Sequence, residues 1–177
     1  MPWRGATSRQ ERILACLPYL LPLLHCYPFG LFLFSQFPPL HWLFVPITWL
    51  MPIYYSGGPG IAIVPLLVFI VLFVTVVRNP RIRHLIRYNT MQALMIGFAL
   101  ALILSLLELL NIVNTALIAP TLSEPSPDVG GLFFILLFDV LFLGTLALVV
   151  FSVVQSLRGH HAEIPIISNA VYAQTRD

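Results

Sequence analysis

Long apolar stretches alternate with short polar segments along this chain of 177 residues. The apolar stretches cover about residues 13–34, 61–77, 92–119 and 132–157. A helix needs roughly 20 apolar residues to cross a hydrocarbon core of ~30 Å, because it rises ~1.5 Å per residue. All four stretches approach or exceed this length. The pattern therefore predicts four transmembrane helices.

Prolines interrupt the first of these stretches, at Pro18, Pro22 and Pro28. Each proline removes a backbone donor and crowds the preceding turn of the helix. We expect a kinked helix whose freed carbonyl groups find partners inside the protein. The two cysteines, Cys16 and Cys26, lie too far apart on one helix for a disulfide and are expected to be packing residues.

A further apolar segment, at about residues 40–55, is too short for a full crossing and contains Pro46 and Pro52. Its length falls in the range of re-entrant and interfacial segments. Its amphipathic aromatic residues favour the depth of the lipid headgroups. These residues are Trp42, Trp49, Tyr54 and Tyr55. We expect a short re-entrant or interfacial helix on the side away from the cytoplasm; whether it crosses the bilayer stays open.

An amphipathic surface helix is predicted at about residues 80–91, directly before the third span. Asn79 and Pro80 have the residue types of an N-cap and a first helical residue. Apolar and charged residues then separate onto two helical faces, as in helices that lie on a membrane surface. The apolar face carries Ile82, Leu85 and Ile86, and the polar face carries Arg83, His84 and Arg87.

The chain has nine basic residues, all of them arginine, and they occur in three groups. The groups are Arg4, Arg9 and Arg12; Arg78, Arg81, Arg83 and Arg87; and Arg158 and Arg176. Positively charged segments stay on the cytoplasmic side during insertion, so an even number of crossings should separate neighbouring groups. We therefore expect residues 1–12 and 158–177 to be cytoplasmic or stromal ends of a four-span domain at residues 13–157.

Composition agrees with a membrane protein, because 59% of the residues are hydrophobic and only 9% are charged. A soluble globule of this length would have too little polar surface to cover itself. The formal net charge is +2, and the arginines border apolar segments instead of forming a stripe, which argues against nucleic-acid binding. The predicted class is an all-α integral membrane protein with four transmembrane helices, a short re-entrant or interfacial helix and an amphipathic surface helix.

Glu108 and Asp139 are the acidic residues within the predicted spans. An ionisable group at membrane depth is a functional hypothesis by default. Counted from the loop between spans three and four, both acids lie at similar depths on the side away from the arginines. Two interpretations follow: a polar or proton-linked site, or a hydrogen-bonded pair that ties span three to span four.

No enzyme motif occurs in the chain. His25, His41 and His84 have no partner at metal-ligand spacing, and His160 and His161 are expected to be an exposed pair without a role. The nucleophile elbow, the zinc-protease motif and the phosphate-binding loop are absent, and the chain has no lysine. We therefore predict no catalytic residue, metal ligand or cofactor, and no enzymatic activity.

Two segments, Val76–Asn79 and Ile86–Ala93, carry a resemblance to a known family. The second contains the specific run Asn89, Thr90, Met91, Gln92 and Ala93. Leu17–Leu23 and Ile164–Ser168 extend the likeness over nearly the whole chain in the same order. The sequence resembles the twenty-kilodalton Tic family, the core membrane subunit of the translocon at the inner envelope membrane of chloroplasts, in its cyanobacterial or plastid-encoded branch.

The resemblance implies a four-span protein with both ends cytoplasmic or stromal, and a role in moving preproteins across or into a membrane. Residues 1–12 lack the character of a transit peptide. The expected location is therefore a cyanobacterial plasma or thylakoid membrane, or the plastid inner membrane if the chain is plastid-encoded. The expected partners are membrane lipids, other translocon or membrane-complex subunits, and translocating polypeptides.

Our leading hypothesis is a membrane-embedded component of a protein translocation complex. The sequence leaves undecided whether this component forms a channel together with partner subunits. Arg78, Arg81, Arg83 and Arg87 are the predicted contacts to lipid headgroups or to a soluble partner. One alternative is an assembly or structural subunit of a photosynthetic membrane complex. A second alternative is a small proton-linked solute carrier that uses the two intramembrane acids.

Overall fold

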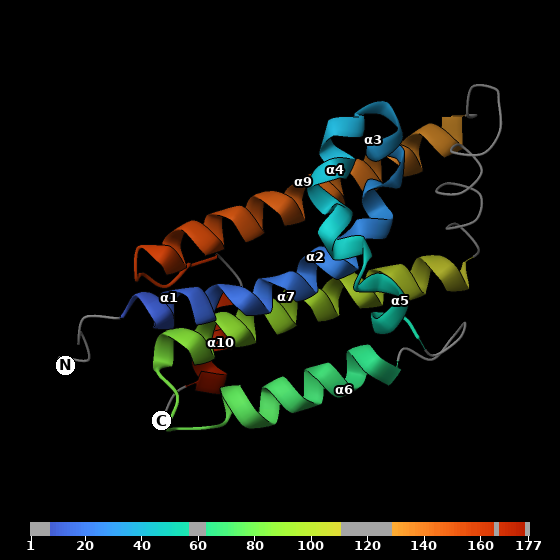
Figure 1. Cartoon of the computed structure of the whole chain (residues 1–177). Helices are drawn as coiled ribbons and strands as arrows, with labels where there is room; N and C mark the ends of the chain where they lie inside the picture. Colours follow the sequence, from blue (N-terminus) through green and yellow to red (C-terminus); the bar gives the residue numbers. More distant parts are fainter. Residues whose placement is uncertain (1–7, 57–62, 111–128, 165–166, 176–177) are drawn as a thin grey trace.

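The computed structural model describes residues 8–56, 63–110, 129–164 and 167–175, which form helices and turns without a β-strand (Figure 1). In chain order the helical elements are α1 (Arg9–Cys16), η1 (Leu17–Tyr19), α2 (Leu20–Cys26), η2 (Tyr27–Gly30), α3 (Leu31–Gln36), α4 (Pro38–Thr48), α5 (Met51–Tyr54), α6 (Ile63–Leu72), η3 (Phe73–Val77), α7 (His84–Leu109), α9 (Val129–Leu157) and α10 (Ile167–Thr175). The predicted all-helical class is confirmed. The end of the predicted third span, residues 111–119, and the loop after it lie outside the described residues.

Three helical segments are long and apolar enough to cross a membrane: Arg9–Gln36, His84–Leu109 and Gly131–Leu157. The segment Ile63–Val77 is apolar but shorter. At ~1.5 Å per residue it extends ~22 Å, less than a hydrocarbon core of ~30 Å. Its last part, η3, has the wider hydrogen bonding of a π-helix, in which Arg78 N donates to Phe73 O at 3.0 Å. The structure thus has three long apolar segments and one short one among the described residues, and the count of four spans stays a prediction.

The first span is broken at two of its three prolines, whereas Pro22 lies within α2. Pro18 lies in η1 and Pro28 lies in η2, and both elements are tighter 3₁₀ turns between α-helical pieces. A residue without an N–H cannot continue the α-helical bonding, so the helix tightens and bends at these points. The cysteines are free thiols, and Cys26 is buried in the core, as expected of packing residues.

The broken helix α1–α3 is the centre of the bundle. Its first two helices pack against both α7 and α9, which lie on either side of them in Figure 1. The largest core cluster gathers aromatic side chains from η2, α3, α4 and α9: Phe29, Phe34, Phe44, Phe138 and Phe142. The Phe34 and Phe142 rings meet edge to face, with centroids 5.2 Å apart. This cluster fixes the half of the bundle toward α3 and α4.

The predicted interfacial segment forms two short helices, α4 and α5, which run across the direction of the long helices (Figure 1). Phe44 is buried against the rings of Phe34 and Phe142, so one face of α4 packs on the bundle. Trp42 and Trp49 point away from the core and are largely exposed. The segment is therefore bent and consists of two short helices, and its place relative to the bilayer stays a prediction.

The structure corrects the start of the predicted surface helix. Residues 80–83 form turns, and α7 begins at His84 and continues unbroken to Leu109. Asn79 caps a turn and not the helix, because Arg81 N donates to its Oδ1 at 3.0 Å. Short polar side chains often bond nearby backbone in this way and so compete with helix formation. The predicted surface helix and third span are therefore one helix.

Candidate functional site

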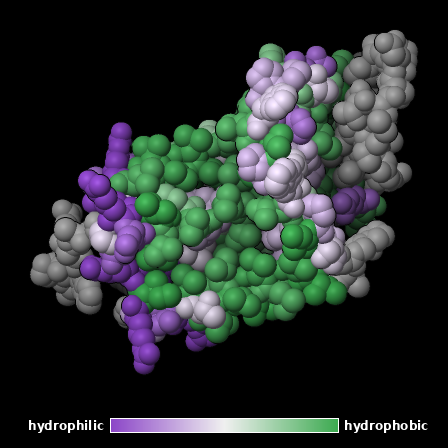
Figure 2. Space-filling view, viewed as in Figure 1, coloured by the Kyte–Doolittle hydropathy of each residue, from purple (hydrophilic) through white to green (hydrophobic). Residues whose placement is uncertain are grey.

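The three arginine-bearing segments meet at one end of the bundle, called here the basic end, where α1 begins and α9 ends (Figure 1). Arg12 Nη1 donates to the Leu157 carbonyl at 3.1 Å, and Arg83 Nε donates to Glu11 Oε1 at 2.9 Å. Figure 2 shows hydrophilic residues gathered at this end, whereas the flank of the bundle is hydrophobic. The arrangement agrees with an even number of passes along the bundle between neighbouring arginine groups.

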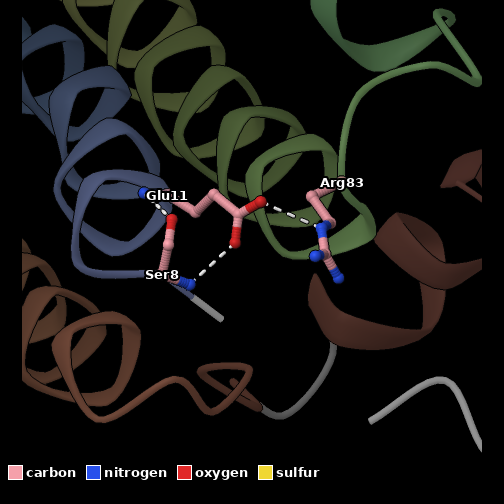
Figure 3. A network of polar contacts seen from close by, with 3 residues as sticks. All are labelled: Ser8, Glu11 and Arg83. Carbon is pink, nitrogen blue, oxygen red and sulfur yellow. Dashed lines mark hydrogen bonds and ion pairs between the residues drawn. The ribbon is translucent and has the colours of Figure 1, made fainter. Parts of the chain in front are cut away.

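Glu11 has two roles at the basic end (Figure 3). It closes a capping box at the start of α1, because Ser8 N donates to Glu11 Oε2 at 2.8 Å and Glu11 N donates to Ser8 Oγ at 3.2 Å. Its other oxygen accepts from Arg83. The Arg83 side chain is 52% exposed, so the pair adds little stability and serves chiefly to align α1 with the start of α7.

Arg87 lies inside the protein, although the sequence pattern placed it on an exposed face beside Arg83. Only 5% of its surface is exposed, and its Nε donates to the Val77 carbonyl at 2.9 Å. A carbonyl at a helix end lacks an intrahelical partner, and a guanidinium is well suited to supply one. Arg87 thus ties the end of η3 to α7. Of the four predicted contact arginines, Arg78, Arg81 and Arg83 are exposed.

A histidine pair joins the tail to α7, which corrects the expectation that His160 and His161 are merely an exposed pair. His84 Nδ1 and His161 Nε2 are 3.0 Å apart, and the Tyr88 hydroxyl donates to Ala162 O at 3.4 Å. Burial lowers the pKa of His161, and the charge of neighbouring His84 lowers it further. Among the described residues, no three His, Cys, Asp or Glu side chains are grouped to bind a metal ion.

The run Asn89, Thr90, Met91, Gln92 and Ala93 lies in the first turns of α7 and faces the interior. All of these residues except Met91 are fully buried. The Tyr19 hydroxyl, from η1, donates to Asn89 Oδ1 at 3.0 Å. Sequence analysis included Tyr19 in the segment Leu17–Leu23 but gave it no role, because nothing local indicates that an aromatic residue in an apolar span meets an amide from another helix.

Helix α9 brings polar side chains to the same region. Ser152 and Ser156 are fully buried, and Ser156 Oγ donates to the Ser152 carbonyl at 2.7 Å. Ser152 lies beside the Tyr19 hydroxyl, so Tyr19 sits between polar groups of α7 and α9. Thr145, Ser152 and Ser156 recur at helical spacing, a signal by which sequence analysis could have found this face of α9.

Several polar atoms of this interior region have no hydrogen-bond partner among the described residues. They are Asn89 Nδ2, Thr90 Oγ1, both amide atoms of Gln92, and Ser152 Oγ. Buried polar atoms are usually bonded, since an unpaired one carries the full cost of desolvation. The interior near the basic end, defined by these four residues and Tyr19 and called here the polar interior, therefore has donors and acceptors that the described chain does not use.

The two intramembrane acids are not brought together. Glu108 is exposed near the end of α7, and Asp139 is partly buried in α9, where its Oδ1 has no hydrogen-bond partner among the described residues. No hydrogen bond or ion pair joins them in the part of the chain that the structure describes. The interpretation that they tie span three to span four finds no support in this geometry.

Comparison with known proteins accounts for nearly the whole chain. The family model described as "Chloroplast import apparatus Tic20-like" matches residues 7–171. A Tic20 family protein from Synechocystis sp. is 39% identical, with 99% of each chain covered. Protein TIC 20-II, chloroplastic, from Arabidopsis thaliana is 28% identical over 95% of this chain and 74% of its own length. Tic20 family protein Ycf60 from Gracilaria tenuistipitata var. liui is 29% identical over 93% of this chain and 74% of its own.

Proposed function

Because the chain belongs to the Tic20 family, we propose that it is a membrane-embedded subunit of a protein translocation complex, without a catalytic step of its own. The family description links such proteins to chloroplast protein import. The proposal extends that link to this chain as a preprotein import-like role, in which any path for a polypeptide is formed together with partner subunits.

The unpartnered atoms of the polar interior carry this proposal. A polypeptide that crosses a bilayer must keep its backbone N–H and C=O groups hydrogen-bonded, because lipid offers them no partner. Asn89, Gln92 and Ser152 hold unused donors and acceptors inside the bundle. They are fully buried, so the bundle has to open, or to join other subunits, before a passenger reaches them.

The exposed arginines of the basic end supply the contact surface of the proposal. Arg78, Arg81 and Arg83 project where α6 and α7 approach each other, and none of them is buried. We assign this surface to the cytoplasmic or stromal side, where anionic headgroups attract arginine. Lipid headgroups or an acidic face of a soluble partner would bind here.

A crosslinking experiment tests the role of the polar interior. A photoreactive residue in place of Gln92 is compared with one in place of Ala147, an exposed position on α9, while a preprotein is arrested in membranes. The proposal predicts adducts with the preprotein from position 92 and few from position 147. Equal labelling, or labelling from neither, contradicts it.

A second experiment addresses the partners. The variant Arg78→Ala, Arg81→Ala, Arg83→Ala should lose co-purifying subunits in mild detergent, whereas the matched triple substitution by lysine should retain them, since charge is kept. Co-purification without any preprotein adduct would instead favour the alternative of an assembly or structural subunit. The proton-linked carrier has no such support, because Glu108 and Asp139 are not joined.

A further inference from the structure

Helix α6 is attached to the bundle mainly at its two ends. None of the residues of Ile63–Leu72 is buried. At the end of α6 away from the basic end, α5 packs on it. At the basic end, the fully buried Val77 of η3 and the hydrogen bond from Arg87 hold it. Between these attachments the Phe69 ring of α6 meets the Phe98 ring of α7, with centroids 6.0 Å apart, and the packing of α6 on the bundle is otherwise incomplete.

A cavity of about 210 Å³ lies behind the middle of α6. Leu66 and Phe69 of α6 form one wall, and Leu94, Phe98 and Ala101 of α7 form another. His25 of α2 lies at its inner side, next to Gly97, whose added Cβ would come within 3.4 Å of the His25 ring. Four helices, α2, α5, α6 and α7, thus enclose one space.

The lining of the cavity offers few hydrogen-bond partners to a water molecule. Among its described residues the polar side chains are His25 and Tyr54, and none is charged. His25 Nδ1 is bonded to the Leu21 carbonyl at 2.9 Å, and Tyr54 Oη lies 3.5 Å from His25 Nε2. A buried water requires two to four polar partners, and these groups already use one another. An empty space would forfeit dispersion contacts along its apolar walls.

The cavity opens sideways, toward the surroundings of the bundle. Leu66 and Phe98 line it and are nevertheless 59% and 55% exposed, so its mouth lies between α6 and α7. The flank of the bundle is covered by hydrophobic residues (Figure 2), as a surface in contact with lipid tails would be. The molecules present at such a mouth in a bilayer are acyl chains.

We propose that this cavity binds one acyl chain of a membrane glycerolipid, inserted between α6 and α7. Apolar groups in a bilayer associate through van der Waals packing and not through exclusion of water, so fit to a preformed space decides binding. The bound chain supplies the contacts that α6 lacks. The position of α6 therefore depends on lipid, whether or not the protein conducts polypeptides.

The test uses the protein in nanodiscs of phosphatidylcholine and phosphatidylglycerol that contain a phosphatidylcholine with a diazirine in one acyl chain. After illumination, mass spectrometry maps the adducts. The peptides of α6 and α7 that line the cavity should carry more adducts than the peptides of α9, whose exposed face reports labelling by the surrounding lipid. Ala101→Phe fills the space and should lower the cavity adducts about tenfold, whereas Ala99→Phe, an exposed position on the same helix, should leave them unchanged.

A second pair of variants guards against misfolding of Ala101→Phe. Leu66 and Leu67 are 59% and 53% exposed, so both tolerate a larger side chain, but only Leu66 lines the cavity. Leu66→Trp should block labelling and Leu67→Trp should not. If α6, α7 and α9 of the unmodified protein were labelled equally, the adducts would come only from the lipid that surrounds the protein, and the proposal would be overturned. An equal loss of cavity adducts in a variant and its control would overturn it as well.

Discussion

Different interactions stabilise the two ends of the bundle. At the basic end, directional bonds join distant segments: Arg83 with Glu11, Arg12 with the Leu157 carbonyl, Arg87 with the Val77 carbonyl, and His84 with His161. At the opposite end, around α3 and α4, aromatic rings pack against one another, as Phe34, Phe44 and Phe142 do. Directional bonds select which segments meet, whereas ring packing requires only matching volume.

The comparison explains the unequal packing of the short segment Ile63–Val77. Its end in η3 belongs to the bonded region through Val77, while α6 extends along the bundle with its side chains exposed or half-exposed. We infer that the basic end sets the register of α6 and α7, and that the other end can adapt to lipid or to partner subunits. The following predictions test this contrast, from the largest expected effect to the smallest.

Replacement of Arg87 by alanine should be the most damaging change. The substitution removes a buried guanidinium and leaves the Val77 carbonyl without its partner. A hydrogen bond to a charged group contributes about 1.5–3 kcal/mol, so we expect a loss of up to about 3 kcal/mol in the free energy of unfolding. Unfolding of the detergent-solubilised protein, followed by circular dichroism, measures the loss. An unchanged midpoint would show that the basic end is not held by this bond.

A pair of glycines probes the ring-packed end. A Cβ on Gly30 would lie 2.7 Å from Phe142 Cδ2, whereas a Cβ on Gly144 would have no atom within 4 Å. Gly30→Ala should therefore cost about 1–3 kcal/mol through overpacking. Gly144→Ala should cost nothing and gain up to about 1 kcal/mol from helix propensity. Thermal unfolding of both variants distinguishes them, and a tolerated Gly30→Ala would mean that this end packs loosely.

The histidine pair makes the basic end sensitive to acid. The pKa of His161 is lowered in the fold, so the unfolded chain binds a proton more readily than the folded one. The free energy of unfolding should have its full value above about pH 6.5, the usual pKa of histidine, and should decrease as the pH drops below it. The measurement is the unfolding midpoint between pH 7.5 and 5.5. His161→Gln should reduce the change of the unfolding midpoint with pH. If the midpoint of this variant changed with pH as much as that of the unmodified protein, another group would be responsible.

The exposed ion pair should have the smallest effect. Arg83→Ala removes the contact with Glu11 at an exposed site, where solvent and salt screen the attraction. We expect little change in the unfolding midpoint, and the remaining difference should vanish at high salt. Comparison of Arg83→Ala, Glu11→Gln and the double variant at low and high salt checks this. A large loss that persists in salt would make this pair, and not Arg87, the main fastening of the basic end.

Much of the fold could be predicted from three properties of the sequence: the length of its apolar stretches, the grouping of its arginines and the positions of its prolines. Hydrophobic length marked the long helices, and the separation of the arginines into groups indicated that those segments come together, as the contacts of Arg12 with Leu157 and of Arg83 with Glu11 illustrate. Pro18 and Pro28 marked two breaks in the first span because the missing N–H acts locally, whereas Pro22 is accommodated within α2. Local chemistry therefore transferred well from sequence to structure.

The candidate site was less predictable, because burial depends on neighbours that are distant in sequence. Arg87 has the residue type of an exposed helical face, yet the carbonyl of Val77 draws it inside. Asn89 was recognised by its family resemblance, but its partner Tyr19 lies 70 positions away. His161 gave no signal of its own until the fold placed it beside His84.

The most direct test concerns the meeting of the three arginine groups at one face of the membrane. Single cysteines are introduced into a Cys16→Ser, Cys26→Ala background at Ser8, Pro80 and His160 of the basic end and at Ser56 near α5, all of them exposed positions. A membrane-impermeant thiol reagent is then applied to each side of sealed vesicles. The account predicts that positions 8, 80 and 160 are labelled from one side and position 56 from the other. Labelling of positions 8 and 80 from opposite sides would contradict it.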